Sequence, residues 1–128
     1  MYELLSNIDS VASKVYRLYN AAFARFPDKK GLTYWIENNL SNKDTFRATA
    51  HSFVISDEFV LLYGLNSSND EYISNLYQNV LGRTPDIQGA NYWSTQLSSK
   101  KEDRSELLIG FSESAENKAI FSNETNIF

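Results

Sequence analysis

Hydrophobic residues near the start of the chain recur at the three- and four-residue spacing of one helix face. They are Ile8, Val11, Ala12, Val15, Leu18, Tyr19, Ala22, Phe23 and Phe26. The same spacing returns later at Ile73, Leu76, Tyr77, Val80 and Leu81. No segment shows the sustained alternation and β-branched enrichment that are typical of strands. The pattern therefore predicts an all-α protein.

The second hydrophobic pattern belongs to an internal repeat with a fixed offset along the chain. The only two prolines, Pro27 and Pro85, are separated by the same interval as the only two tryptophans, Trp35 and Trp93. Other identical pairs at this offset are Leu18/Leu76, Tyr19/Tyr77, Arg25/Arg83, Asp28/Asp86, Gly31/Gly89, Tyr34/Tyr92, Phe53/Phe111, Ser56/Ser114 and Glu58/Glu116. We expect a single domain, 1–128, with a lead-in at 1–8 and pseudo-repeats at about 9–65 and about 70–128.

Residues that favour helix ends divide each repeat into three or four helices. Arg25 and Arg83 lie near the predicted end of the first helix, where a cation suits the helix dipole. Gly82 suits the position just past that end. Asp28 and Asp86 follow proline and are the predicted N-caps of the helix that carries glycine, tyrosine and tryptophan.

A third helix follows a polar spacer in each repeat, and a short fourth helix comes after it. Asp103 and Glu106 have the spacing of a capping box, and Ser56 and Ser114 are predicted N-caps of the fourth helices. Because units of this size are marginal alone, we expect the two repeats to share one core. The fold class that we predict is an all-α domain of two tandem pseudo-repeats, each with three to four helices, packed against each other through their first helices.

The repeated motif reads Leu76-Tyr77-x5-Arg83-x-Pro85-Asp86-x2-Gly89-x2-Tyr92-Trp93 in the second copy, followed by Phe111-x2-Ser114-x-Glu116. It resembles the bacterial family called domain of unknown function 4214, and the resemblance covers nearly the whole chain in two tandem copies. The first copy departs from the family pattern at Ala24, where glycine is usual, and the second departs at Asn117, where phenylalanine is usual.

The resemblance implies an all-helical module that is distantly similar to the phycobilisome linker domain. Such modules resemble accessory parts of large secreted or cell-surface bacterial proteins, and a cytoplasmic or virion-associated location is the alternative. The family supplies no catalytic residue. The start of the chain, Met1-Tyr2-Glu3-Leu4-Leu5, has neither the basic region nor the long apolar stretch of a secretory signal.

Two motif elements have both a functional and a structural interpretation. Arg25, Asp28, Arg83 and Asp86 could form sites for a carboxylate, a cation or a sugar hydroxyl, but helix punctuation favours an interhelical corner in which arginine pairs with aspartate. The Tyr34-Trp35 and Tyr92-Trp93 pairs could stack on sugars, but their helical spacing favours the core. Gly31 and Gly89 would then let a neighbouring backbone approach closely.

The remaining chemistry gives little support for catalysis or metal binding. His51, the single histidine, has Ser52, Ser56 and Asp57 nearby, but His51 lies within one predicted helix and no nucleophile turn is present. Calcium loops need several oxygen ligands, whereas the segment from Pro85 to Gly89 offers one carboxylate. We expect no catalytic residue, no metal site and no cofactor.

Composition narrows the class of partner. The chain is 42% hydrophobic and 14% aromatic, carries a net charge of −4 and has no cysteine. These values argue against disorder, thiol chemistry and cysteine-bound metal. The charge also argues against nucleic acid, and we expect the basic doublets Lys29-Lys30 and Lys100-Lys101 to lie in turns as solvated charges. No segment supports membrane insertion.

These observations predict a noncatalytic structural or protein-interaction module of bacterial or phage origin, with a protein partner or self-association. The first alternative is a glycan-binding accessory domain of a secreted or cell-surface protein. Further alternatives are a linker-like protein of a light-harvesting or virion assembly and a small hydrolase. The motif residues at the centre of each hypothesis are Arg25, Pro27, Asp28, Gly31, Tyr34, Trp35, Arg83, Pro85, Asp86, Gly89, Tyr92 and Trp93.

Overall fold

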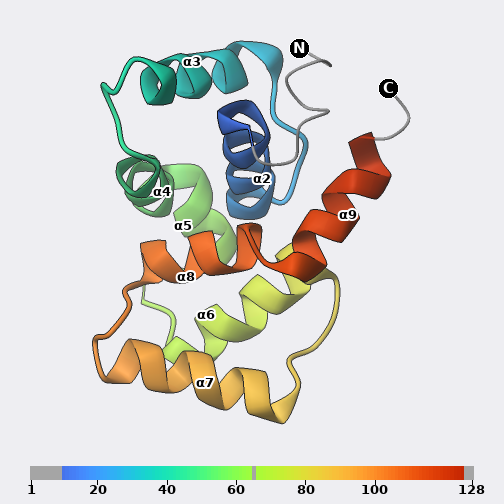
Figure 1. Cartoon of the computed structure of the whole chain (residues 1–128). Coiled ribbons are helices and arrows are strands. Elements are labelled where there is room, and N and C mark those ends of the chain that lie inside the picture. Colours follow the sequence, from blue (N-terminus) through green and yellow to red (C-terminus); the bar gives the residue numbers. More distant parts are fainter. Residues whose placement is uncertain (1–9, 65, 126–128) are drawn as a thin grey trace.

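A computed structural model, shown in Figure 1, describes residues 10–64 and 66–125, and within these residues every regular element is helical. The first half contains α2 (Val11–Phe23), α3 (Lys29–Leu40), α4 (Phe46–Val54) and α5 (Asp57–Tyr63). The second half contains α6 (Asn69–Leu76), the π-helical turn η1 (Tyr77–Leu81), α7 (Ile87–Ser98), α8 (Arg104–Ser112) and α9 (Ala115–Thr125). The all-α prediction is confirmed. The expected lead-in at 1–8 lies outside the described residues.

The helices of the two halves begin at equivalent positions. The starts of α6, α7, α8 and α9 follow those of α2, α3, α4 and α5 at the offset of the sequence repeat. Side-chain caps explain why the boundaries repeat: Asp28 accepts from Gly31 N at 2.9 Å, and Asp86 accepts from Gly89 N at 3.0 Å. The predicted duplicated unit of three to four helices is therefore present in the backbone.

The other predicted caps are present as well. Asp103 and Glu106 form a capping box at the start of α8. Ser56 accepts from Phe59 N at 3.2 Å, and Ser114 accepts from Asn117 N at 3.1 Å. Gly82 ends η1 in the left-handed region with φ 67°. Glycine adopts this conformation readily because it has no Cβ.

The first half makes the same left-handed turn without glycine. Ala24 is the C-cap of α2 and has φ 53°. A Cβ in this region is strained because it approaches the following carbonyl oxygen. The two repeats thus adopt one backbone conformation, and the first adopts it at a higher conformational cost.

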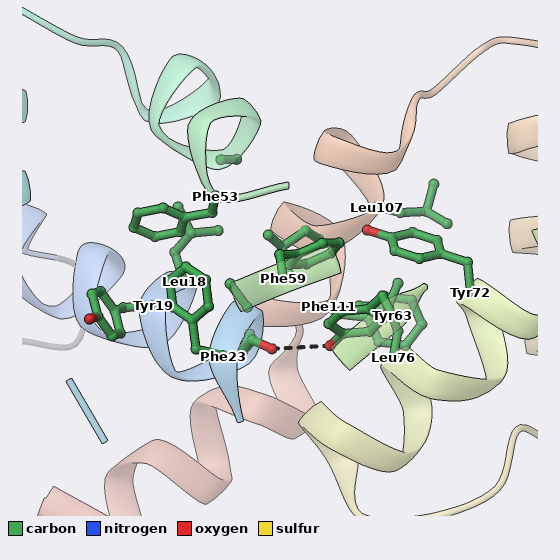
Figure 2. Packing of buried hydrophobic residues seen from close by; sticks show 14 of the residues in the cluster. Leu18, Tyr19, Phe23, Phe53, Phe59, Tyr63, Tyr72, Leu76, Leu107 and Phe111 are labelled. Carbon is green, nitrogen blue, oxygen red and sulfur yellow. Dashed lines mark hydrogen bonds between the residues drawn. The ribbon is translucent and has the colours of Figure 1, made fainter. Parts of the chain in front are cut away.

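A continuous aromatic and aliphatic core joins the two halves, as Figure 2 shows. Its labelled members are Leu18, Tyr19, Phe23, Phe53, Phe59, Tyr63, Tyr72, Leu76, Leu107 and Phe111. The rings of Phe59 and Tyr63 stack with centroids 4.2 Å apart. The Tyr63 hydroxyl donates to the Ala21 carbonyl at 3.2 Å, the dashed line in Figure 2, and this bond ties α5 to α2.

The halves dock mainly through α8, which packs against both α2 and α4. The expectation that the first helices form the main contact is wrong, because α2 contacts η1, the end of its counterpart, less extensively than it contacts α8. At the α2/α8 contact the buried Arg17 forms a two-bond ion pair with Glu113, at 2.5 and 2.9 Å. Figure 1 shows α8 between α3 and α7, which lie at opposite ends of the molecule.

Candidate functional site

The first corner lies between α2 and α3 and is built around Arg25. Its Nε and Nη2 donate to the two carboxylate oxygens of Glu58, at 2.8 and 3.0 Å. Nη2 also donates to the Tyr19 hydroxyl at 3.0 Å, and that hydroxyl donates to Asp28 Oδ1 at 3.0 Å. The Arg25 guanidinium also lies over the Tyr19 ring, 5.1 Å from its centroid. One network thus connects the end of α2, the start of α3 and the start of α5.

The charges of this corner stabilise one another. The hydrogen bonds from Arg25 lower the pKa of the Glu58 carboxyl, and the bond to Glu58 raises the pKa of Arg25. The backbone N–H of Gly31 lowers the pKa of Asp28, and burial raises the pKa of the Tyr19 hydroxyl. At neutral pH all three charged groups stay ionised while the tyrosine stays neutral.

The second corner repeats the central ion pair. Arg83 donates from Nε and Nη2 to the two oxygens of Glu116, each at 2.9 Å, and lies over the Tyr77 ring at 5.0 Å. Its Nη1 reaches Asp86 Oδ1 at 3.5 Å, closer than the 3.9 Å between Arg25 and Asp28. The hydrogen bonds from Arg83 lower the pKa of Glu116, as in the first corner.

The arginine's main partner differs from the predicted one. Each arginine makes its short, two-bond pair with the glutamate that opens the fourth helix, and the aspartate of the motif serves mainly as an N-cap. The signal was present in the sequence, because Glu58 and Glu116 are themselves a repeated pair. Residue preferences at helix ends concern neighbours in sequence. They do not identify this partner, because the arginine and the glutamate are 33 residues apart.

The prolines and glycines of the motif shape the two corners. Pro27 and Pro85 are half-buried in the connections that lead to α3 and α7. A Cβ on Gly89 would collide with the hydroxyl of Tyr77. The side chain of Tyr77 therefore favours glycine at this position. At Gly31 a Cβ would meet only the capping carboxylate of Asp28, 3.0 Å away. The expected close backbone neighbour is found at neither glycine.

The Tyr-Trp pairs divide between core and surface. Trp35 and Trp93 are half-buried against the main core, as predicted, with centroids 5.1 Å from Phe53 and 5.2 Å from Phe111. Tyr34 and Tyr92 are 51% and 54% exposed, so the expectation of a core position is wrong for them. Each tyrosine ring is held edge-on by its tryptophan at 4.9 Å, and about half of the residue stays open to solvent.

The residues around His51 are engaged in helix structure. The Ser52 hydroxyl donates to Ala48 O at 3.1 Å, and the Ser56 hydroxyl donates to Phe53 O at 2.7 Å while capping α5. His51 is exposed. It lines a hollow of about 300 Å³ between α4 and α8, together with Thr45, Arg47, Ala48, Asp103 and Ser105. In this hollow Arg47 pairs with Asp103 at 3.2 Å.

The part of the chain that the structure describes contains neither a candidate metal site nor a candidate membrane-spanning helix. Over residues 10–64 and 66–125, no three histidine, aspartate or glutamate side chains are grouped so that they could hold a metal ion. None of the helices in those segments combines the length and apolar character needed to cross a bilayer.

The family described as Domain of unknown function (DUF4214) matches residues 50–121, more than half of the chain. The chain belongs to this family. The DUF4214 match runs from α4 to α9 and includes the complete second corner, with Arg83, Asp86 and Glu116. It is a single match, so two copies of the family and a likeness to phycobilisome linkers stay predictions. No curated protein and no solved structure shows a significant match to the chain.

Proposed function

We propose that this DUF4214 domain is a noncatalytic protein-interaction module. The observation that carries the proposal is the exposure of Tyr34 and Tyr92, the one aromatic pair of the repeated motif that faces solvent in both halves. A large ring held in place by its neighbour loses little conformational freedom on binding, which is why tyrosine is enriched at interfaces. The tyrosines lie on α3 and α7, at opposite ends of the molecule, so the module could hold two partners at once (Figure 1).

The polar half of the motif supports the same function. Arg25 and Arg83 donate hydrogen bonds to their glutamates. The two capping aspartates accept hydrogen bonds from backbone N–H groups. These bonds connect the helix ends at each corner and so hold in place the helix that presents each tyrosine. The motif then has an inner part that builds the fold and an outer part that contacts a partner.

Photocrosslinking tests this proposal. A photoreactive phenylalanine derivative is placed at Tyr34, at Tyr92 or, as a control, at Lys101, an exposed turn residue between α7 and α8. In an extract of the cells that express the protein, we expect defined crosslinked species from positions 34 and 92 that unlabelled wild-type chain competes away. Equal crosslinking from position 101, or none from 34 and 92, would overturn the proposal.

A glycan-binding accessory domain is the second candidate, and the surface of α7 favours it. Ile87–Ser98 carries no charged residue, and Tyr92 is flanked by the exposed amides and hydroxyl of Gln88, Asn91 and Thr95. Neutral hydrogen-bonding groups around an aromatic ring suit a sugar. A glycan array probed with the wild type and with Tyr92→Ala separates the two candidates. Glycan binding by the wild type that is lost in Tyr92→Ala would favour the glycan-binding domain.

A further inference from the structure

The outer face of α3 combines cationic and aromatic groups. Lys29 and Lys30 are exposed in its first turn, and Tyr34 lies one turn after Lys30 on the same side of the helix. These residues and Thr33 and Glu37 line an open hollow of about 440 Å³. Lys29 and Lys30 form no ion pair with any carboxylate within residues 10–64 and 66–125. The prediction that this doublet lies in a turn is wrong, because both lysines are helical.

Two lysines are a costly choice at this place in the fold. The first turn of a helix carries the positive end of the dipole, where acidic residues stabilise and cations destabilise. Acidic residues occupy the first turns of α5, α6, α8 and α9, whereas α2, α3, α4 and α7 have none. Lys29 and Lys30 therefore gain nothing from the helix dipole, and their exposed ammonium groups are open to an electrostatic partner.

The counterpart face on α7 shows what the fold alone requires. Ile87 and Gln88 occupy the positions of Lys29 and Lys30, and Tyr92 is exposed to nearly the same extent as Tyr34. The backbone, the N-cap and the tyrosine are shared, and charge distinguishes α3: it carries Lys29, Lys30 and Glu37, whereas α7 has no charged residue.

Resting on the protein-interaction function above, we propose that the α3 face, formed by Lys29, Lys30 and Tyr34, docks an acidic segment of a partner protein. Carboxylates of the segment would pair with the two ammonium groups, and an apolar side chain of the segment would lie against the exposed ring of Tyr34. The charge would supply selectivity and association rate, and the ring would supply buried area. The α7 face, with the same ring and no charge, would not select acidic partners.

A matched pair of peptides tests the charge requirement. One fluorescein-labelled peptide is rich in glutamate with leucine as its only apolar residue, and its control has glutamine in place of every glutamate. Fluorescence anisotropy with the full chain should show binding of the glutamate peptide only, with affinity falling as salt rises, since exposed ion pairs are screened. Equal binding of both peptides, or of neither, overturns the proposal.

Exchanging residues between the repeats locates the site. Lys29→Ile with Lys30→Gln gives α3 the α7 residues, which fit this backbone, and should weaken binding by about tenfold. Ile87→Lys with Gln88→Lys should create a second site, which raises the stoichiometry. Circular dichroism checks folding, and Lys30→Gln alone serves if the double variant unfolds. Unchanged affinity in a folded lysine variant overturns the proposal.

Two further outcomes separate this proposal from the broader one. Binding to phosphatidylserine vesicles but to neither peptide would assign the face to a membrane surface and overturn docking of an acidic segment. If the glutamate peptide fails while crosslinking from positions 34 and 92 persists, the interaction function stands and only the acidic partner is wrong. If both fail, both are wrong.

Discussion

The two corners of the molecule contain the same residue types and use their tyrosines differently. In the first corner, Tyr19 links Arg25 to Asp28 through its hydroxyl. In the second, the hydroxyl of Tyr77 lies against the bare backbone of Gly89, and Arg83 approaches Asp86 directly. The helix that carries Tyr19 is α-helical to its end, whereas the π turn begins at Tyr77.

This difference separates what the motif fixes from what it leaves free. The arginine–glutamate pair and the aspartate N-cap are the same in both corners. The role of the tyrosine and the residue before arginine vary with the local helix ending. The repeat therefore specifies helix boundaries and their mutual anchoring, and the surrounding structure adapts within that frame.

The largest loss of stability is expected at a contact that has no equivalent in the other half. Arg17 and Glu113 pair across α2 and α8, but the residues at the equivalent positions of α6 and the end of α4 are Asn75 and Ile55, which cannot form an ion pair. Arg17→Ala leaves the carboxylate of Glu113 without its partner and should cost about 3–5 kcal/mol. Urea unfolding followed by circular dichroism measures this loss.

The double variant Arg17→Met with Glu113→Leu is the control, because it removes both charges together. It should be more stable than Arg17→Ala, since replacing a buried pair by apolar residues is often nearly neutral. If the double variant is as unstable as the single one, shape at this contact matters more than charge. Within the described residues Nη1 of Arg17 has no hydrogen-bond partner, which is a further reason to expect partial recovery.

The two glycines offer a direct test of how the corners differ. Gly89→Ala should cost about 1–3 kcal/mol because the new methyl group collides with the hydroxyl of the buried Tyr77. Gly31→Ala meets only its own capping aspartate and should be nearly neutral. Thermal unfolding compares the two. Adding Tyr77→Phe to Gly89→Ala should recover stability, and no recovery would show that the hydroxyl is not the obstacle.

Substitutions at the two left-handed residues that precede the arginines should change the free energy of unfolding in opposite directions. Ala24→Gly removes a strained Cβ and should stabilise the protein, whereas Gly82→Ala introduces the same strain and should destabilise it, each by about 1 kcal/mol. Chemical denaturation measures both. Destabilisation by Ala24→Gly would mean that the methyl group contributes more through contacts than it costs through its backbone conformation.

The smallest expected effect concerns the ion pair that the corners share. Arg25 holds the folded pKa of Glu58 below its unfolded value. The resulting stability is present above the unfolded pKa of about 4.3 and is lost as the pH falls through the folded pKa. The side chains of Arg25 and Glu58 are 42% and 43% exposed. Solvent screening therefore limits this stability to about 1 kcal/mol or less.

Glu58→Gln should therefore be less stable than wild type at neutral pH and lose its disadvantage in acid, as unfolding curves at the two pH values would show. Glu116→Gln should behave in the same direction, because Arg83 lowers the pKa of that carboxyl in the same way. A pH-independent deficit in either variant would mean that the glutamate acts through packing and not through charge.

The sequence by itself determined that the chain is helical and where several helices begin, although α2 ends at Phe23 and leaves Phe26, a member of the predicted helix face, exposed. The hydrophobic period, the offset of the two prolines and tryptophans, and the caps at Asp28, Asp86 and Asp103 are local features, and hydrogen bonds between near neighbours in sequence realise them. The family resemblance rested on the same features, and the match over residues 50–121 confirms it.

Only the tertiary structure decided which partners meet across the chain and which side of each helix is covered. Arg25 pairs with Glu58 and Arg17 with Glu113 because helices distant in sequence pack together. Helix caps do not determine which helices pack together. Tyr34 and Tyr92 share a helical spacing with buried residues, yet they face solvent because, among the described residues, no helix packs over that side of α3 or α7. Periodicity gives a residue's direction on its helix, whereas burial depends on what the rest of the chain places there.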